Sequence, residues 1–433
     1  MNARDHAFSQ LVSAQLPGWH DAPAAQHRAT ESPTDPRDRA LGDAITTVVT
    51  KNLLLLRHLM RHYAGRNLTS IDVGVQIIIA IGLAQLRFFT RVPASAAVDE
   101  AVEQAKRLRF GKAGGFVNAL LRRATREPDA PLPKITDPEQ YARVVLSTPP
   151  DLFNRLEKLM GVENAIKLCV KHNTEAPTLI RLADGVPLRH LQEPPAGNAN
   201  VTFTPAHRAG FYVADGAIEK DYARWSLAGL AQVQDLTSAL VVVASVVSSA
   251  KRVLDRCCGV GTKTLQLAAA APGAEIVAMD SAAWRIERLN NSLSHRQITN
   301  VHTHVASMMS HVPDAGLFDY ILIDAPCSNS GVIIRRPEAR YRQDARALAS
   351  LAELQQRILF DTIPHLAPGG TLVYSTCSIW DDENGDVISA LCAANADLKV
   401  IELKTTKPSL SDDPTQHHDG GYRALLRREA STA

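Results

Sequence analysis

The chain has 433 residues, of which 45% are hydrophobic and 21% are charged, and its formal net charge is +2. This length exceeds what one hydrophobic core supports and predicts about three domains, and the composition excludes a disordered or fibrous protein. The six cysteines form no CxxC pair, and no histidine cluster with zinc-ligand spacing accompanies them. We therefore expect reduced thiols, no bound metal and a cytoplasmic location.

Neither the N-terminus nor the most apolar stretch has the features of a membrane-directed segment. Met1–Ala14 carries charges and no apolar core, so we expect no signal peptide. Val73–Leu86 is too short to cross a membrane and is followed by Arg87 and Arg91. This stretch is predicted to be a buried helix, and no membrane partner is expected.

Residues 1–128 are predicted to form an all-α domain. An amphipathic run begins at Ala7, and apolar residues at helical spacing predict further helices at 41–63, 71–89, 96–108 and 113–126. Between Glu100 and Arg126, seven basic residues stand against two acidic ones. A basic helix pair is typical of a surface that contacts a phosphate backbone, and Arg107, Arg122 and Arg123 are the predicted RNA contacts. From charge alone, a solvated helix face is an equally good interpretation.

Residues 129–225 are predicted to form a linker and a small α+β RNA-binding subdomain. The Pro-rich segment 127–133 separates this region from the helices before it. A helix is expected from Pro150 to Leu159, and short β-like runs follow at 178–182 and 210–213.

Residues 226–433 alternate between strand-like and helix-like segments, which predicts an α/β, Rossmann-like domain with a parallel sheet. The expected strands are 252–255, 275–280, 301–305, 320–324 and 371–375. Helical segments such as 282–296 and 345–366 fall between them. Two late runs, 398–403 and 421–426, are expected to form a closing antiparallel hairpin.

The first of these strands leads into a glycine turn that is typical of a nucleotide-cofactor site. Asp255 ends the strand, and Gly259 and Gly261 follow, which lets the backbone turn tightly and approach a ligand. Asp280 ends the next strand, where an acidic residue can bind a ribose diol. The pattern indicates an adenosine cofactor, either NAD or S-adenosylmethionine. Thr264 replaces the third glycine of a dinucleotide motif, which argues against a dehydrogenase; a purely structural turn is the alternative.

Two cysteines follow the last two parallel strands. Cys327 comes after Asp324-Ala325-Pro326, and Cys377 comes after Ser375-Thr376. Because ligands bind at the carboxyl ends of such strands, we expect both thiols to face one pocket. The sources of positive charge expected to lower the thiol pKa are Lys263, Arg335, Arg336 and Arg340. The remaining cysteines are interpreted as small buried apolar residues.

A thiolate, a carboxylate and a methyl donor together suit methylation at C5 of a pyrimidine. That carbon is a weak nucleophile until a thiolate adds to C6. A carboxyl group at N3 or N4 can stabilise the resulting shift of charge. A second thiol can assist the release of the product.

Several motifs resemble one known family. D-A-P-C-S-N-S-G-V-I-I-R-R-P-E (324–338) and Y-S-T-C-S-I-W-D-D-E-N (374–384) resemble the two cysteine motifs of the RNA cytosine-5 methyltransferases of the Nol1/Nop2/Sun family. R-D-R-A-L (37–41), R-V-P-A-S-A-A-V-D-E-A-V (91–102) and G-F-V-N-A-L-L-R-R (115–123) resemble the NusB-like RNA-binding domain of the bacterial Sun/Fmu 16S rRNA enzymes. Residues 419–422 resemble the last hairpin of that family.

The resemblance implies a class I methyltransferase domain that uses S-adenosylmethionine. It implies that Cys377 is the nucleophile, that Cys327 assists release and that Asp324 contacts the cytosine. The residues that it places at the cofactor are Asp255, Cys257, Gly259, Gly261, Lys263, Asp280 and Asp324. It implies RNA contacts at Arg335 and Arg336, and 16S rRNA as the substrate of a monomer.

The chain departs from the family pattern at three places. The first motif is D-R-C-C-G-V-G-T-K-T (255–264) rather than D-x-C-A-A-P-G-G-K-T, the stretch 305–308 lacks an acidic residue, and the arginine pair at 335–336 is shifted. Two alternatives stay open. One is an RNA-binding ribosome-assembly or regulatory factor with a degenerate methyltransferase domain, and the other is the same chemistry on tRNA.

Overall fold

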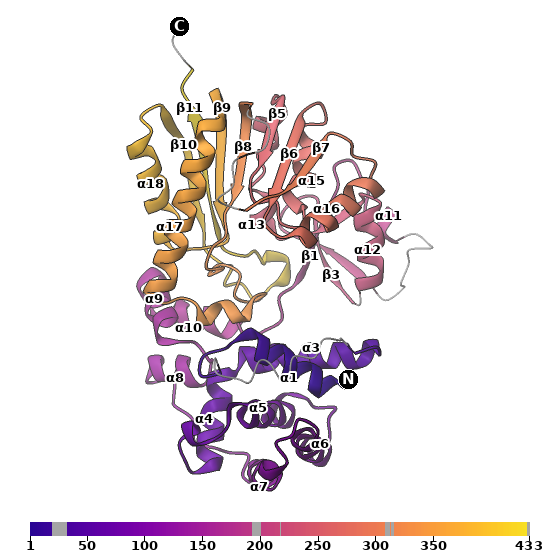
Figure 1. Cartoon of the computed structure of the whole chain (residues 1–433), viewed down its shortest axis with the longest axis vertical. Coiled ribbons are helices and arrows are strands. Elements are labelled where there is room, and N and C mark those ends of the chain that lie inside the picture. Colours follow the sequence, from indigo (N-terminus) through magenta and orange to yellow (C-terminus); the bar gives the residue numbers. More distant parts are fainter. Residues whose placement is uncertain (20–32, 193–200, 217, 308–311, 313–315, 431–433) are drawn as a thin grey trace. The chain divides into compact units, whose positions relative to one another are not determined.

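The computed structural model describes the chain except for residues 20–32, 193–200, 217, 308–311, 313–315 and 431–433. The chain divides into two compact units (Figure 1). The first contains Met1–Glu175 and Ile333–Asp344, and the second contains Ala176–Val332 and Ala345–Ala433. The segment Ile333–Asp344 therefore belongs to the first unit, although it lies within residues 226–433, the region predicted to be the methyltransferase domain.

The first unit is helical. Its elements are α1 (Ala3–Ala14), α3 (Pro36–Lys51), α4 (Leu53–Ala64), η1 (Leu68–Ser70), α5 (Val73–Phe88), α6 (Ala94–Arg107), η2 (Gly111–Ala113), α7 (Gly114–Arg126), α8 (Pro138–Val144), α9 (Pro150–Met160), α10 (Val162–Lys171) and η3 (Pro337–Tyr341). The helices predicted at 71–89, 96–108 and 113–126 are confirmed as α5, α6 and α7.

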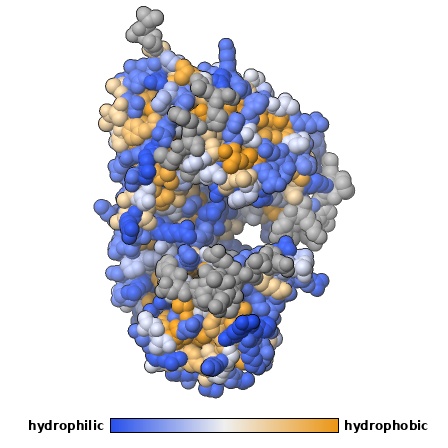
Figure 2. All heavy atoms as spheres, viewed as in Figure 1, coloured by the Kyte–Doolittle hydropathy of each residue, from blue (hydrophilic) through white to orange (hydrophobic). Residues whose placement is uncertain are grey.

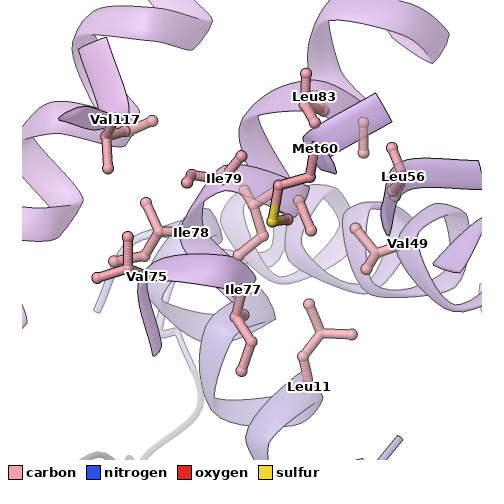
Figure 3. Packing of buried hydrophobic residues seen from close by; sticks show 14 of the residues in the cluster. Leu11, Val49, Leu56, Met60, Val75, Ile77, Ile78, Ile79, Leu83 and Val117 are labelled. Carbon is pink, nitrogen blue, oxygen red and sulfur yellow. The ribbon is translucent and has the colours of Figure 1, made fainter. Parts of the chain in front are cut away.

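Helix α5 lies at the centre of this unit. Figure 3 shows Ile78 and Ile79 between Val117 of α7 and Leu56 of α4. Residues 74–85 of α5 are all buried, because apolar side chains occur around the whole helix and neighbouring helices cover it. The predicted buried helix is confirmed. Among the described residues, no helix combines the length and the apolar character that crossing a membrane requires.

The predicted helix at 41–63 is wrong as a single element, because it breaks at Asn52. Asn52 ends α3 and precedes α4, and its side chain donates to the carbonyl oxygen of Val48 at 2.9 Å. The Nη1 of Arg340 donates to the carbonyl oxygen of Lys51 at 2.8 Å, and the hydroxyl of Tyr341 donates to that of Thr50 at 2.8 Å. These distant residues satisfy helix-end carbonyls that a continuous helix would bond internally, so local periodicity could not reveal the break.

The second unit contains two sheets. Its strands are β1 (Thr178–Leu182), β2 (Thr202–Pro205), β3 (Phe211–Asp215), β4 (Ala231–Val233), β5 (Arg252–Asp255), β6 (Glu275–Asp280), β7 (Val301–Val305), β8 (Phe318–Asp324), β9 (Leu366–Thr376), β10 (Leu398–Thr406) and β11 (Gly421–Arg428). Its helices are α11 (Arg189–Gln192), α12 (Glu219–Leu227), α13 (Leu236–Ala239), α14 (Ala244–Val247), α15 (Thr262–Ala270), α16 (Ala283–His295), α17 (Ala345–Thr362), η4 (Ile363–His365), η5 (Asp381–Glu383), α18 (Gly385–Ala394) and η6 (Pro414–Gln416).

The larger sheet has the order β10-β11-β9-β8-β5-β6-β7. Strands β5 to β9 pair in parallel, and β10 and β11 close the sheet as an antiparallel hairpin. The predicted α/β, Rossmann-like fold and its closing hairpin are confirmed. The smaller sheet, β2-β3-β1-β4, is antiparallel throughout.

Both faces of the parallel sheet are apolar. In β8, Ile321 and Ile323 pack in a cluster with α17 and α18, whereas Tyr320 and Leu322 pack in a cluster with α15 and α16. This alternation follows from the two-residue period of a strand, and continuous apolar runs are expected where helices cover both faces. Because β5, β6, β8 and β9 run parallel, their carboxyl ends meet at one edge of the sheet. Polar residues follow each strand there. Figure 2 shows hydrophobic residues scattered among hydrophilic ones on the visible face of this unit.

Candidate active site

The two predicted cysteines lie together at this edge. Asp324 of β8 pairs in register with Ser375 of β9, so the loops that leave these strands start side by side. Cys327 Sγ and Cys377 Sγ are 3.2 Å apart, and both cysteines are free. We call Asp324–Gly331 and Ser375–Glu383 the thiol edge.

Asn329 and Gly331 set the shape of the first cysteine loop. Asn329 has a φ of 59°, which is uncommon for a residue other than glycine. Its amide nitrogen donates to the carbonyl oxygen of Cys327 at 3.0 Å, and its Oδ1 accepts from the thiol of Cys377 at 3.1 Å. A Cβ on Gly331 would lie 2.5 Å from the backbone of Gly420 and 2.8 Å from the carbonyl oxygen of Cys377. Only glycine permits this close approach of three loops.

Glu383 joins the two cysteine loops, and sequence reasoning missed it. Its carboxylate is fully buried and accepts from the Oγ of Ser328 and the Oγ of Ser378, each at 2.5 Å. It also accepts from the backbone nitrogen of Ser328 at 2.8 Å and from Nε2 of Gln355 at 3.1 Å. Each serine directly follows a cysteine, so one carboxylate fixes both thiols. The signal available in the sequence was the acidic run that ends the second cysteine motif, but it does not reveal which carboxylate points inward.

The pKa of Cys327 is raised well above its usual value. The hydrogen bond with Cys377 is the largest cause, and burial adds to it. The thiol of Cys327 therefore stays protonated near neutral pH. The predicted lowering of the thiol pKa by nearby cations is wrong for Cys327, because burial and the neighbouring thiol outweigh any such field.

Of the four predicted cations, Lys263 lies at the thiol edge, whereas the three arginines belong to the first unit. Lys263 Nζ lies 2.6 Å from Asp324 Oδ2, so its charge is balanced locally. Arg340 is 1% exposed and donates within the first unit to the carbonyl oxygens of Lys51 and His172 and to Oδ1 of Asn173. Arg335 and Arg336 are exposed on the same segment of that unit.

Asp324 is held firmly but remains accessible. Its Oδ1 accepts from the hydroxyl of Ser375 at 2.7 Å, and its side chain is 33% exposed. Burial alone lowers the pKa of Lys263, but the charge of Asp324 and the hydrogen bond to it raise the pKa above its usual value. A charged lysine therefore orients a carboxylate that can still meet a ligand.

The glycine turn after β5 has the predicted geometry. Gly259 and Gly261 have φ angles of 57° and 90°. A Cβ on Gly261 would lie 2.3 Å from Leu289 Cδ1, whereas a Cβ on Gly259 would meet nothing within 4 Å. Gly261 thus permits close packing against α16, and the backbone at Gly259 borders open space.

Asp280 faces this turn from the end of β6. Its Oδ2 accepts from the backbone nitrogen of Gly259 at 3.0 Å, and its Oδ1 accepts from that of Ala282 at 2.9 Å. Arg285 Nη1 lies 3.4 Å from the same carboxylate. Asp280 is 4% exposed and fixes the shape of the turn, and the open space beside the turn fits an adenosine cofactor.

Asp255 and Cys257, both predicted at the cofactor, differ in exposure, because Asp255 is buried and Cys257 is partly exposed. Asp255 is fully buried, its Oδ2 accepts from the hydroxyl of Thr264 at 2.7 Å, and burial raises its pKa to about 7. Burial also raises the pKa of Cys257. Asp255 thus holds the start of α15.

The stretch 305–308, which lacks the acidic residue of the family pattern, is described in part. Its Ala306 packs against the core of the sheet. Met308, the last residue of the stretch without an acidic residue, lies outside the described residues.

The predicted RNA contacts of the first unit are largely paired with carboxylates. Arg107 contacts Asp5 at 3.1 Å and Glu100 at 2.7 Å. Arg123 contacts Glu127 at 3.0 Å, and Arg122 lies 3.8 Å from Asp99. Three of these four carboxylates lie outside the window from Glu100 to Arg126, so the local charge count overstated the free positive charge.

One cluster near β11 has the residue types of a metal site. Possible ligand atoms of Asp235, His417 and Asp419 lie within 4.8 Å of one another. Asp235 accepts from the backbone nitrogens of Thr237 at 2.8 Å and Asp419 at 3.1 Å, and His417 Nε2 lies 3.3 Å from Asp419 Oδ1. These bonds connect α13 to the loop before β11, which gives the cluster a structural role.

Known proteins and protein families are similar to this chain in both of its parts. The family described as 16S rRNA methyltransferase RsmB/F matches residues 245–426, and the NusB family matches residues 1–126. The protein called ribosomal RNA small subunit methyltransferase B of Erwinia tasmaniensis is 31% identical over 94% of this chain and 93% of its own length. The protein of the same name in Vibrio cholerae is 30% identical over 99% of this chain and 98% of its own.

The chain belongs to the RsmB/F methyltransferase family. This membership confirms the predicted family, the NusB-like helical domain and S-adenosylmethionine as the cofactor. The crystal structure of PH0851 has a TM-score of 0.76, shares 20% identity and covers 98% of this chain and 99% of that chain, which shows the same fold. In this RsmB/F chain, the residues that would hold the cofactor are the turn at Gly259–Gly261 and the carboxylate of Asp280.

Proposed function

We propose that this chain methylates C5 of a cytosine in RNA, and that the RNA is 16S rRNA. The observation that carries the proposal is the thiol edge, where Cys327 and Cys377 lie 3.2 Å apart beside the accessible carboxylate of Asp324. The names of the relatives, which specify the small-subunit rRNA, support the choice of substrate. In the first unit, the proposed RNA contacts are Arg107 of α6 and Arg122 and Arg123 of α7, each of which lies near a carboxylate.

In the proposed reaction, Cys377 activates the base. The Cys377 thiol first loses its proton to water. The thiolate then adds to C6 of the cytosine, forming a carbon–sulfur bond, and the electron pair of the C5–C6 double bond makes C5 nucleophilic. Asp324 accepts a hydrogen bond from the N4 amino group and positions the base, while Lys263 and Ser375 keep its carboxylate in place. S-adenosylmethionine supplies the methyl group that C5 receives.

Cys327 completes the cycle by moving protons. Its raised pKa keeps a proton on sulfur, and this proton passes to the Cys377 sulfur as the bond to C6 breaks. In the same elimination the C5 proton leaves to water, and the electron pair of the C5–H bond forms the C5–C6 double bond again as the sulfur departs. Cys327 then regains a proton from water. A thiol that stays protonated near neutral pH suits the role of general acid in this step.

The experiment that tests this function is bisulfite sequencing of RNA from cells with and without the protein. We expect one or more sites of C5-methylcytosine in 16S rRNA to disappear when the protein is absent. If C5-methylcytosine disappears from tRNA instead, cytosine methylation is supported, but 16S rRNA as the substrate is overturned. No loss in either RNA would overturn methylation and favour the ribosome-assembly factor.

A further inference from the structure

The second unit contains a cleft away from the thiol edge that no part of the proposed reaction uses. It has a volume of about 900 Å³ and lies between the smaller sheet and α15. Arginines from four different elements or loops line it: Arg181, Arg208, Arg296 and Arg423. Asp184 is the one acidic residue among the described residues that line it.

Two of these arginines rest against neutral partners. Arg181 of β1 donates from Nε to Gln234 Oε1 at 2.7 Å. Arg296, which follows α16, donates from Nη2 to Gln232 Oε1 at 3.3 Å and to Ser226 Oγ at 3.5 Å. Neither makes an ion pair with a carboxylate in the part of the chain that the structure describes.

Arg181 and Arg296 also lie close enough to repel each other. Burial lowers the pKa of both arginines, and the charge of Arg181 lowers that of Arg296 further. The Nε of Arg296 is buried without a hydrogen-bond partner. The charge of Asp184 partly offsets this cost for Arg181. Two half-buried cations with one carboxylate near them remain costly, and an anion that joins them reduces that cost.

The other two arginines differ from this pair. Arg423 contacts both carboxylate oxygens of Glu402, at 2.7 and 2.6 Å, and also donates to the carbonyl oxygen of Leu240. Its charge is therefore already balanced. Arg208 is exposed at the rim of the cleft, where solvent screens it.

The glutamines hold the pair in place. Gln232 pairs with Arg181 across the β1–β4 ladder. Gln234 donates to Gln266 of α15 at 3.2 Å, and Gln266 donates to the carbonyl oxygen of Ala239 at 2.8 Å. These hydrogen bonds connect the smaller sheet to α15 and α13. The position of the Arg181 guanidinium group is therefore set by both layers.

We infer that Arg181 and Arg296 form a phosphate-binding site, and that the phosphates are those of the RNA backbone. Guanidinium groups match phosphate oxygens in geometry and charge. One end of the cleft reaches Thr262, the residue before Lys263, which contacts Asp324. A nucleic-acid strand that flanks the target base can therefore leave the thiol edge along α15. The inference goes beyond the methylation reaction and rests on RNA being the substrate.

The test compares the double variant Arg181→Gln/Arg296→Gln with Arg288→Gln in binding to full-length 16S rRNA over a series of salt concentrations. Arg288 is exposed on α16 and does not line the cleft. For two lost phosphate contacts on single-stranded RNA, we expect the salt slope of log K to decrease by about 1.4 and the affinity at low salt to fall about tenfold. Arg288→Gln should keep the wild-type slope and the wild-type kcat at saturating RNA. Circular dichroism and the thermal midpoint confirm that both variants are folded.

A second arm distinguishes RNA from a small phosphate ligand. Inorganic phosphate is titrated against the wild type and the double variant, and the thermal midpoint is recorded. If phosphate stabilises only the wild type while rRNA binding is the same in both, the cleft binds a free phosphate compound and the RNA assignment is overturned. If the double variant matches Arg288→Gln in rRNA affinity, salt slope and phosphate response, the whole inference is overturned. Because binding needs no methyl transfer, these outcomes are distinct from failure of the proposed reaction.

Discussion

The connection from β8 to α17 has two halves with different tasks. Residues Asp324–Val332 belong to the second unit and carry Cys327, Ser328 and Asn329, whereas Ile333–Asp344 belongs to the first unit and carries the buried Arg340. In the first half, one buried carboxylate, Glu383, fixes the thiols. In the second half, one buried guanidinium fixes helix ends. A motif that is continuous in the sequence thus serves chemistry in one unit and packing in the other.

We expect substitutions in residues 324–332 to affect activity and substitutions in residues 333–344 to affect stability. Changes at the thiol edge should reduce methyl transfer with little effect on the first unit. Changes at Arg340 should weaken the first unit while the thiols keep their geometry.

The largest effect is expected for Cys377→Ala. Loss of the nucleophile should reduce kcat by more than about 10⁴-fold, as is usual when a covalent nucleophile is removed. The thermal midpoints of both units should stay close to the wild type, because Cys377 packs at an edge rather than in a core. Methyl transfer from radiolabelled cofactor to 16S rRNA measures the effect, and normal turnover by the variant would show that another residue attacks.

The second effect is on stability and concerns Arg340→Gln. The guanidinium donates to three backbone carbonyls and one side chain within 3.4 Å through Nη1 alone, and its loss leaves buried acceptors unsatisfied. We expect a loss of about 3 kcal/mol, or a decrease of roughly 6 to 12 °C in the midpoint of the first unit's transition. Scanning calorimetry measures it, with the exposed Arg346→Gln as the control. An unchanged thermal midpoint would show that Arg340 does not stabilise the first unit.

A smaller effect on rate is expected for Glu383→Gln. Both serine hydroxyls donate to Oε2, whereas Oε1 accepts from the backbone nitrogen of Ser328 and from Gln355. The amide nitrogen of a glutamine would replace one of these acceptors with a donor, so the cysteine loops lose part of their support. We expect kcat to fall about 30-fold with little change in KM, because charge-assisted hydrogen bonds contribute about 2 kcal/mol each. Glu353→Gln on the exposed face of α17 is the matched control. Equal kcat values for the two variants would contradict the positioning role of Glu383.

The smallest predicted effect is on thiol reactivity. Since the pKa of Cys327 is raised, less thiolate is present at pH 8.5 than for an ordinary cysteine, and iodoacetamide should label Cys327 at least about tenfold more slowly than in the denatured chain. Cys377→Ala removes the hydrogen-bonding neighbour, lowers the pKa of Cys327 and should speed its labelling. Mass spectrometry of the labelled peptides follows the rate, and labelling at the denatured rate would contradict the coupling of the two thiols.

Much of the sheet could be predicted from the sequence. Strand positions followed from apolar runs that end in Asp255, Asp280 and Asp324, because helices cover both faces of the sheet. The pairing of the thiols followed from the rule that carboxyl ends of parallel strands meet at one edge. These features depend on local pattern and on a general rule of topology.

The features that were missed depend on contacts between distant residues. The break at Asn52 is held by Arg340, and the thiols are held by Glu383, which lies 55 positions from Ser328. The count of basic residues near Arg107 failed for the same reason, since Asp5 neutralises it from α1. A local window contains neither Arg340 for the helix break nor Asp5 for Arg107, and although Glu383 lies in the second cysteine motif, its bonds to Ser328 cross to the other loop.

The central claim is that Cys377 forms a covalent bond with the RNA and that Cys327 assists in breaking it. The most direct measurement incubates Cys327→Ala with S-adenosylmethionine and 16S rRNA, separates the products under denaturing conditions and maps the cross-linked peptide by mass spectrometry. We expect a stable protein–RNA adduct attached at Cys377 and none with the double variant Cys327→Ala/Cys377→Ala. An adduct at another residue, or normal release of methylated RNA by Cys327→Ala, would contradict it.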